Sequence, residues 1–387
     1  MCLPKIYITA ICFCSLFTFK LPAQPIELTV NKNAVQQTIH SFGASDAWRT
    51  QFVGKNWPLE KREAIADLLF SKEFDGHGNP KGIGLSLWRF NIGTGSAEQG
   101  GNSGIVEEWR KTDCFMDKYG HFDWSKQEGQ RWFLEAARKR GVEKILGFTN
   151  AAPYFFAKNN MARSSGGIHF NLQPDKYRDY AHFLAEVGTH FKFDYLSPIN
   201  EPQWDWNGNS QEGTPATNEE CSILIYNLNR ELSNLHSNCK IAFGEAGDIK
   251  FLFKSNTGNP CRDNQIAELF TDTGIFSISR LPYLNPCVTS HSYWSVWDLN
   301  TLIAQRKALH AKMKSLVPDF DYWQTEYCVM EKNDDIGGGS GRDLSMNTAL
   351  YVARIIHFDL TLANASSWQW WTALSEGDYK DGLVYID

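Results

Sequence analysis

Two short segments of the sequence each run from an apolar stretch straight into a glutamate. Glu201 ends the stretch 193–201 and precedes Pro202, while Glu326 ends the stretch 321–326. A proline cannot donate to a strand ladder, so the first strand must stop there and leave its glutamate at the rim of a sheet. Two carboxylates across one cleft can cleave a glycosidic bond, because one protonates the leaving oxygen while the other attacks the sugar carbon or polarises water there. The competing interpretation, two solvated glutamates at strand ends, is disfavoured by the asparagine that precedes Glu201 and by the aromatic residues around both.

The composition fits a large globular enzyme that handles sugars. The 387 residues, 42% of them hydrophobic, suffice for one large barrel-type domain. Aromatic residues make up 14% of the chain and include 14 tryptophans. Sugar rings stack on indole and phenol rings, so an aromatic excess favours a carbohydrate cleft, although roughly half of the tryptophans are expected to fill the core. The net charge of −6 and the lack of any lysine or arginine run argue against a nucleic-acid partner.

The N-terminus has the pattern of an export signal. Lys5 precedes an apolar run over residues 6–19, and a small residue, Ala23, follows at a plausible cleavage point. A run of about fourteen apolar residues is too short to span a bilayer comfortably, so a signal peptide is favoured over an anchor. Lipidation at Cys12 or Cys14 is a lesser alternative. We therefore predict a signal peptide over residues 1–23, a secreted, periplasmic or cell-surface protein, and no transmembrane segment after removal of the signal.

The cysteines indicate neither a metal site nor a defined set of disulfides. Six cysteines follow the signal, without a C-x-x-C or Cys/His spacing typical of metal ligands. An oxidising compartment would permit disulfides, but their pairing cannot be deduced from sequence.

Short β-rich runs alternate with segments of helical periodicity along the mature chain, which is the pattern of a parallel sheet with crossover helices. Eight strands are predicted, the number that closes a (β/α)8 TIM barrel, at residues 39–45, 84–90, 144–149, 193–200, 240–245, 287–293, 321–326 and 365–371. Helices are predicted at residues 58–69, 126–140, 176–191, 219–235, 299–316 and 345–362. In such a barrel the chemistry sits at the carboxyl ends of the strands. Glu201 then ends strand four and Glu326 ends strand seven.

Charged and hydrogen-bonding residues at other strand ends are candidates to support the two glutamates. Arg89, near the end of strand two, is expected to hydrogen-bond the attacking carboxylate and keep it ionised, with a rim salt bridge as the alternative. Tyr293, which ends strand six, is a candidate to hold Glu326 in its attacking rotamer. His291 is a candidate to orient the site, although a buried histidine with satisfied hydrogen bonds is the alternative.

A further set of polar and aromatic residues is predicted to bind the sugar. Asp46 and Asn150 are candidates for hydroxyl recognition, with a helix cap or a turn residue as the alternative. The full substrate-binding set is Asp46, Trp48, Asn150, Tyr154, Trp204, His291, Trp294, Trp368 and Trp370.

These motifs together resemble one known family. The segments are 41–46, Trp88-Arg89, Asn200-Glu201-Pro202, 291–293 and 324–326, and their combination resembles glycoside hydrolase family 30, a family of (β/α)8 retaining glycosidases. The resemblance covers nearly the whole mature chain. It implies that Glu201 is the acid/base, that Glu326 is the nucleophile, that Arg89, Asn200 and Tyr293 assist them, and that neither a metal nor an organic cofactor is needed.

Within the family, segments 43–49, 86–90 and 149–150 most resemble the endo-β-1,6-galactanase-like branch. The substrate would then be a β-linked polysaccharide or oligosaccharide. The alternatives are a β-glucosidase, a β-1,6-glucanase, a xylanase, or a carbohydrate-binding protein without catalytic activity.

One departure from the family concerns its second domain. Family members carry a β-sandwich beside the barrel, built from a short N-terminal piece and a long C-terminal one. Residues 24–38 are expected to hold the N-terminal strands of that sandwich, and the chain stops at Asp387, soon after strand eight. We therefore expect one catalytic domain over residues 24–387, with its C-terminal sandwich part truncated.

Overall fold

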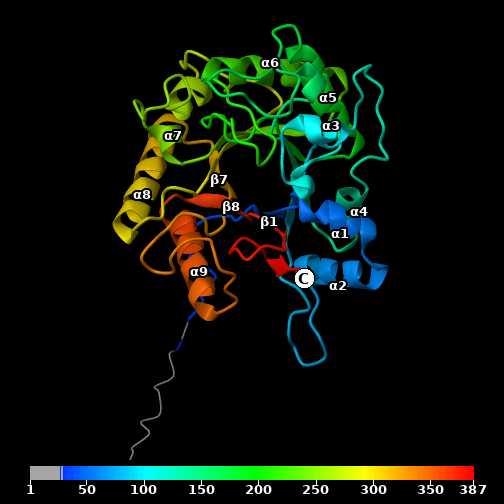
Figure 1. Ribbon diagram of the computed structural model, residues 1–387. Helices are drawn as coiled ribbons and strands as arrows, with labels where there is room; N and C mark the ends of the chain where they lie inside the picture. The colour runs from blue at the N-terminus through cyan, green and yellow to red at the C-terminus, as the bar shows by residue number, and fades with distance from the viewer. Residues whose placement is uncertain (1–26, 28) are drawn as a thin grey trace, which may run out of the picture. The chain divides into compact units, whose positions relative to one another are not determined.

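Eight parallel strands close into a barrel in the computed structural model of the protein, which describes residue 27 and residues 29–387 (Figure 1). The strands follow one another around the barrel in chain order, and the last pairs with the first. They are β1 (Ser41–Ser45), β2 (Leu87–Asn91), β3 (Lys144–Phe148), β4 (Tyr195–Ser197), β5 (Lys240–Ala246), β6 (Leu284–His291), β7 (Asp321–Glu326) and β8 (Ala365–Trp370). All eight predicted strands are present, and the predicted (β/α)8 barrel is confirmed.

Strand β2 shows how the sequence points one arginine into the barrel. Successive residues of a strand face opposite sides of the sheet. Trp88 and Phe90 pack in the large core beneath the helices, whereas Leu87 packs in a smaller cluster inside the barrel. Arg89 and Asn91 share the parity of Leu87, and both are fully buried. The alternation therefore places a guanidinium inside the barrel.

Strand β4 is shorter than predicted. It ends at Ser197, because Pro198 has no N–H with which to continue the ladder. Glu201 lies beyond the strand with a φ of 46°, in the left-handed region. Its backbone N–H donates to the carbonyl of Glu245 at 3.0 Å. A turn anchored to β5, rather than the strand itself, therefore holds Glu201.

The helices surround the barrel, and the six that were predicted are all present (Figure 1). Three of them start at a side-chain cap: Thr217 and Glu220 form a capping box, and Asp298 and Ser345 each accept a backbone N–H of the first turn. The helices are α1 (Arg49–Asn56), α2 (Leu59–Phe70), α3 (Ser96–Gln99), α4 (Glu128–Lys139), α5 (Tyr177–His190), α6 (Asn218–Asn234), α7 (Lys250–Phe253), α8 (Leu299–Leu316) and α9 (Met346–Thr361). Helices α1, α3 and α7 were not predicted.

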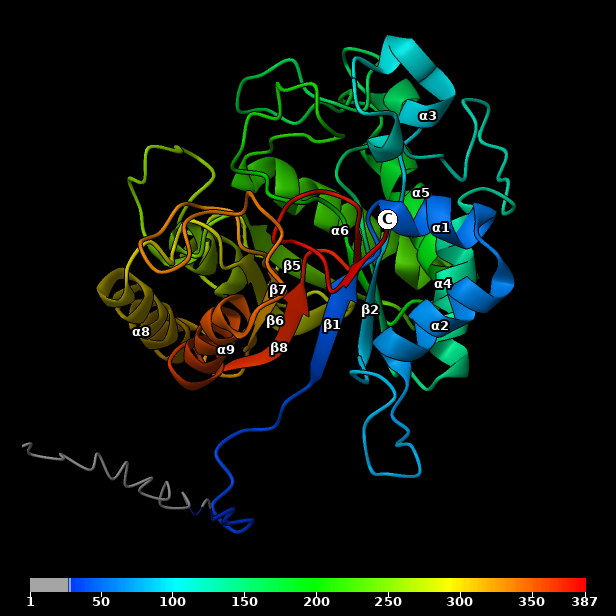
Figure 2. The ribbon, with the colours of Figure 1, turned by 60° about the horizontal axis from the view of Figure 1, so that its bottom comes forward.

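The segment after β8 folds over the carboxyl ends of the strands. Trp371 donates its N–H to the carbonyl of Tyr327 at 2.9 Å, and Ala373 donates to that of Ser45 at 2.8 Å. Two short strands, β9 (Leu374–Ser375) and β10 (Val384–Tyr385), then pair with each other. Figure 2 shows β8 and β1 side by side with this last part of the chain near their ends. The residues that follow β8 thereby become part of the rim.

The N-terminal predictions have different outcomes. The signal peptide over residues 1–23 lies outside the described residues. Residue 27 and residues 29–38 carry no strand, and the hydrogen bond from Ala34 to Asn31 closes a turn there. The expected sandwich strands are therefore not formed in this described part, because a strand needs a pairing partner. Residues 37–387 form a compact unit of their own.

Two further observations concern the described part of the chain. Within it, no helix is long and apolar enough to cross a membrane. Its cysteines carry free thiols, and they are Cys114, Cys221, Cys239, Cys261, Cys287 and Cys328.

Candidate active site

Arg89 is the centre of a hydrogen-bonded network inside the barrel. Its Nη1 donates to Glu326 Oε2 at 2.6 Å, and its Nη2 donates to Glu245 Oε2 at 2.8 Å and to Asn200 Oδ1 at 2.9 Å. The guanidinium carbon lies 3.7 Å from the centre of the Phe148 ring. The planar fork of an arginine can serve several acceptors at once. One side chain therefore ties β5, β7 and the turn after β4 to β2.

The two glutamates singled out in the sequence meet at His291. Its Nδ1 lies 2.8 Å from Glu201 Oε1 and 3.7 Å from Glu326 Oε1. One carboxylate oxygen of each glutamate and the ring nitrogen lie within 4.8 Å of one another. Retaining glycosidases hold their two carboxyl groups about 5–5.5 Å apart, whereas inverting enzymes need about 6.5–9.5 Å to admit a water. The spacing therefore fits direct attack by one carboxylate.

The cluster of charged side chains around His291 carries one more negative charge than positive charges, so it can bind one additional proton. Three buried carboxylates, Glu201, Glu245 and Glu326, face two cations, Arg89 and His291. An uncompensated buried charge is costly, so one added proton neutralises the cluster. Burial raises the pKa of Glu201, against the opposing hydrogen bond from His291. Glu201 is therefore the carboxyl group best placed to carry the proton and donate it.

Glu245 and His291 hold fixed charges of opposite sign. Burial alone would raise the pKa of Glu245, but the charge of Arg89 and the hydrogen bond from His291 outweigh it and lower the pKa to about 2. Burial alone would lower the pKa of His291, but the charge of Glu326 and the hydrogen bonds to Glu201 and Glu245 raise it to about 10. His291 is thus protonated at neutral pH and donates from both ring nitrogens.

The protonated state of His291 also bears on metal binding. Glu201, His291 and Glu326 are close enough to meet at one ion. A protonated imidazole has no lone pair to offer a metal, so the three groups fit a hydrogen-bonded network better than a metal site.

A cavity of about 540 Å³ opens above the two glutamates and is lined mostly by aromatic and polar side chains. Both Glu201 and Glu326 line it, as do Asn200 and Tyr293. Its tryptophans are Trp48, Trp109, Trp204, Trp206, Trp294 and Trp371. One group of tryptophans lies in the segments that follow β1, β2 and β8, and it consists of Trp48, Trp109 and Trp371. The other three lie in the segments that follow β4 and β6. Aromatic walls on both sides of the glutamates suit a sugar chain that crosses the site.

Some residues expected to touch the sugar lie elsewhere. Trp368 and Trp370 have the parity of β8 that faces the outer core, and their indole N–H groups donate to Asp359 Oδ2 at 2.9 Å and to the Asp381 carbonyl at 2.7 Å. The strand alternation thus removes both from the cavity, and Trp371, just past the strand end, lines it instead.

Three more of the predicted sugar-binding residues, Asp46, Asn150 and Tyr154, are not among the cavity-lining residues. Asp46 is fully buried, accepts the backbone N–H of Asn91 at 2.7 Å, and has a pKa that burial raises to about 8. Asn150 is 1% exposed. Asp46 thus supports the end of β2 through a backbone hydrogen bond, whereas the side-chain amide of Asn150 has no hydrogen-bond partner among the described residues.

Two of the predicted supporting residues have different contacts from those expected. The hydroxyl of Tyr293 donates to Cys328 Sγ at 3.8 Å rather than to Glu326, although Tyr293 lines the cavity. His291 is fully buried and contacts Glu201 and Glu245, so it lies behind the carboxylates and is not among the residues that line the cavity.

Glu245 is the functional candidate that sequence reasoning missed. It lies near the end of β5 and is fully buried. The signal that singled out Glu201 and Glu326, a glutamate closing an apolar strand, was present here as well. Its complete burial, its ion pair with Arg89 and its contact with His291 distinguish it from a solvated strand end.

Comparison with known proteins identifies the family. The sequence model of O-glycosyl hydrolase family 30 matches residues 25–385 of the chain. The chain belongs to this family. The resemblance seen in its motifs is therefore confirmed.

An endo-β-1,6-galactanase from Hypocrea rufa is 26% identical over 230 residues, which make up 54% of this chain and 46% of that protein. The chain thus matches about half the length of this relative. The crystal structure of a conserved exported protein from Bacteroides fragilis is 42% identical, with a TM-score of 0.87, over 90% of this chain and 72% of the other. The catalytic domain of a family 30 xylanase C from Talaromyces cellulolyticus, at 19% identity, shares the fold with a TM-score of 0.59 over 91% of this chain and 72% of its own.

Proposed function

We propose that this family 30 protein is a retaining glycoside hydrolase that cleaves a β-linked polysaccharide or oligosaccharide, in the manner of an endo-β-1,6-galactanase. The close pairing of Glu201 and Glu326, with oxygens within 4.8 Å, is the observation that carries the proposal. The activity named for the Hypocrea rufa relative supports the choice of substrate.

The reaction would proceed by double displacement. Glu201 protonates the glycosidic oxygen while Glu326, oriented by Arg89 at 2.6 Å, attacks the anomeric carbon. The leaving sugar departs, and Glu201 then takes a proton from the water that hydrolyses the glycosyl-enzyme. Two inversions at one carbon retain the β configuration.

The supporting residues would act on these two carboxyl groups. Protonated His291 stabilises negative charge on Glu201 as its proton leaves, since its Nδ1 lies 2.8 Å away. Glu245 keeps both His291 and Arg89 charged and in position. Asn200 accepts from Arg89 at 2.9 Å, which fixes the side chain that precedes Glu201.

We further propose that residues 1–23 are a signal peptide, that the protein is secreted, periplasmic or at the cell surface, and that residues 24–387 contain the catalytic domain. The described export of the Bacteroides fragilis relative supports this location. Purification of the mature protein and N-terminal sequencing would test the cleavage point.

A panel of polysaccharides with product sizing tests the proposed activity. β-1,6-Galactan, β-1,6-glucan, xylan and an aryl-β-glucoside are incubated with the protein, with Glu326→Gln as the control for contaminating activity. Short oligosaccharides from β-1,6-galactan, released first as the β-anomer, are expected. Another substrate preference would reassign the specificity within the family, and binding without products from any glycan would make this a carbohydrate-binding protein.

A further inference from the structure

One cation in the wall of the cavity forms no ion pair with the described residues. Arg110 follows β2 in a short turn (Glu108–Arg110) and lines the cavity that holds Glu201 and Glu326. No carboxylate oxygen of the described residues lies within 4.0 Å of its side-chain nitrogens. Its polar contact is a long one, from Nη1 to Gln211 Oε1 at 3.5 Å, and its Nε is buried without a partner. Hydrogen-bonding capacity is therefore left over at this guanidinium.

A neighbouring arginine in the same wall shows the contrast. Arg49 also lines the cavity, but its Nη1 pairs with Glu376 Oε2 at 2.6 Å. Its charge is thus already balanced by an ion pair, whereas no carboxylate of the described residues forms an ion pair with Arg110.

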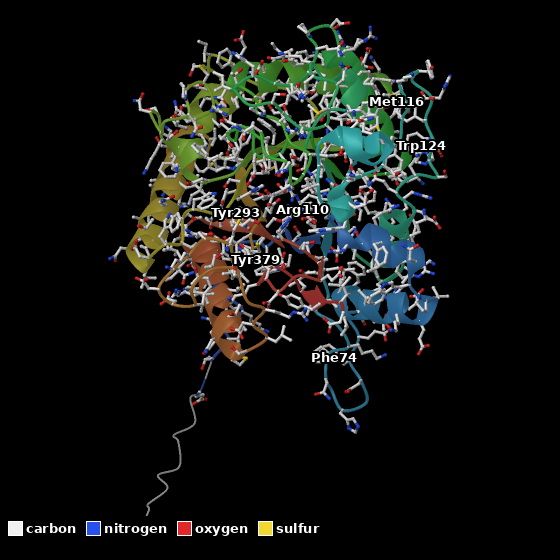
Figure 3. All side chains as sticks on the ribbon, in the orientation of Figure 1. Phe74, Arg110, Met116, Trp124, Tyr293 and Tyr379 are labelled. Atoms are coloured by element: carbon white, nitrogen blue, oxygen red, sulfur yellow. The ribbon has the colours of Figure 1, made fainter. Side chains whose placement is uncertain are left out.

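Aromatic packing holds Arg110 in its half-buried place. Its guanidinium carbon lies 4.6 Å from the centre of the Trp109 ring and 5.0 Å from that of Trp48. Trp48 in turn meets Trp371 edge to face at 5.2 Å. Guanidinium groups that pack on indole rings keep their N–H edges available for planar acceptors. Figure 3 labels Arg110 together with two other cavity residues, Tyr293 and Tyr379.

Arg110 would gain from a negative ligand. Burial lowers its pKa, the charges of Glu107 and Asp381 counter this only in part, and the nearby charge of Arg49 lowers it further. Removing a cation from water without a close anion is unfavourable, and a bound anion would relieve that cost.

We propose that Arg110 binds an anionic substituent of the sugar chain, and that the carboxylate of a uronic acid is the group it fits. This inference rests on the proposed glycosidase function, because it places the acidic sugar in the same cavity as Glu201 and Glu326. A carboxylate matches the forked guanidinium with two parallel hydrogen bonds. Trp371, a partly exposed indole of the same wall, is the candidate to stack on the ring that bears the carboxylate.

Paired substrates test the proposal. We would compare a uronate-bearing β-linked galacto-oligosaccharide with the same compound after chemical reduction of its carboxyl group to an alcohol. The wild-type protein is expected to show a kcat/KM at least about 10-fold higher for the acidic member, mainly through KM, because a charged hydrogen bond remote from the reacting bond strengthens binding.

Arg110→Met should bring this acidic-to-neutral ratio close to one, and Arg110→Lys should restore it in part. Arg280→Met is the matched control, since Arg280 is 81% exposed and pairs with Asp272 outside the cavity. It removes one arginine and should leave the ratio unchanged. A wild-type ratio near one, or equal losses on both substrates in Arg110→Met, would overturn the proposal and make Arg110 a structural residue.

Two further arms separate the remaining outcomes. In the first arm, a sulfated oligosaccharide replaces the uronate-bearing one. If Arg110→Met lowers the kcat/KM of the sulfated compound toward that of the neutral compound, and leaves the uronate-bearing compound unaffected, the anion bound by Arg110 is a sulfate ester and not a carboxylate. If neither substrate is cleaved, the proposed function fails, and calorimetry with the same pair decides the anion site independently. Tighter binding of the acidic member that Arg110→Met abolishes would support the site, and equal binding of both members would refute it.

Discussion

Replacing Glu245 by glutamine should separate the electrostatic support of the site from its chemistry. The substitution preserves the size of a fully buried side chain and removes its charge. The amide oxygen can take the place of Oε2, which accepts from Arg89 Nη2 at 2.8 Å and lies 3.3 Å from His291 Nε2, but it carries no negative charge. Arg89 and His291 then keep an acceptor but lose the negative charge that pairs with both of them.

The pH dependence of the effect follows from the pKa of Glu245. That pKa is about 2 in the folded protein, against an ordinary value of 4.5. A folded pKa below the unfolded one stabilises the protein above about pH 4.5, and the gain is lost as the pH falls toward 2. The difference between the folded and unfolded pKa values corresponds to a stabilisation of the folded state by about 3 kcal/mol at pH 7 and by about 1.5 kcal/mol at pH 3.

Urea unfolding of the wild type and of Glu245→Gln, at steps from pH 7 to pH 3, measures this difference. We expect the variant to be less stable by about 3 kcal/mol at pH 7 and the gap to narrow by about half at pH 3. Glu73→Gln is the control, because Glu73 is an exposed partner of Lys81 and should change stability by less than about 0.5 kcal/mol. A gap of constant size across this pH range would show that the charge of Glu245 is not its source.

Three other predictions concern single residues. Glu201→Ala should lower activity about 10²–10⁴-fold on polysaccharide but much less on aryl glycosides, whose good leaving groups need little protonation. Azide should partly restore the activity of this variant, because azide attacks the glycosyl-enzyme without needing a base to activate water. An equal loss on both substrates, without rescue by azide, would contradict the acid/base role. Arg89→Lys should lower the free energy of unfolding in urea by about 3–5 kcal/mol and should lower kcat. The reason is that a lysine cannot donate hydrogen bonds to Glu326, Glu245 and Asn200 together. A variant as stable and as active as the wild type would show that the positive charge alone suffices. Burial raises the pKa of Glu331 from the ordinary value of 4.5 to about 7, so the protein loses stability as the pH rises from 4.5 to 7. Glu331→Gln should therefore raise Tm at pH 8 but not at pH 4.5. An equal shift of Tm at both pH values would refute this explanation.

The sequence alone was sufficient for the barrel and for the two principal glutamates. Apolar runs of strand length, spaced by helical segments, required eight parallel strands, and a parallel barrel brings all the carboxyl ends to one rim. Glu201 and Glu326 closed two of these runs, so their meeting followed from the fold class. These features are local or are set by strand order, which sequence patterns report directly.

The tertiary structure alone decided which neighbours complete the site. Arg89 and Glu326 are 237 positions apart, and only the closed barrel brings their side chains to 2.6 Å. Trp371 rather than Trp368 or Trp370 lines the cavity, because the direction of a side chain at a strand end depends on the parity and bend of the backbone there. The proton state of Glu201 likewise depends on burial and on His291, since a pKa is set by distances between charges that no sequence spacing contains.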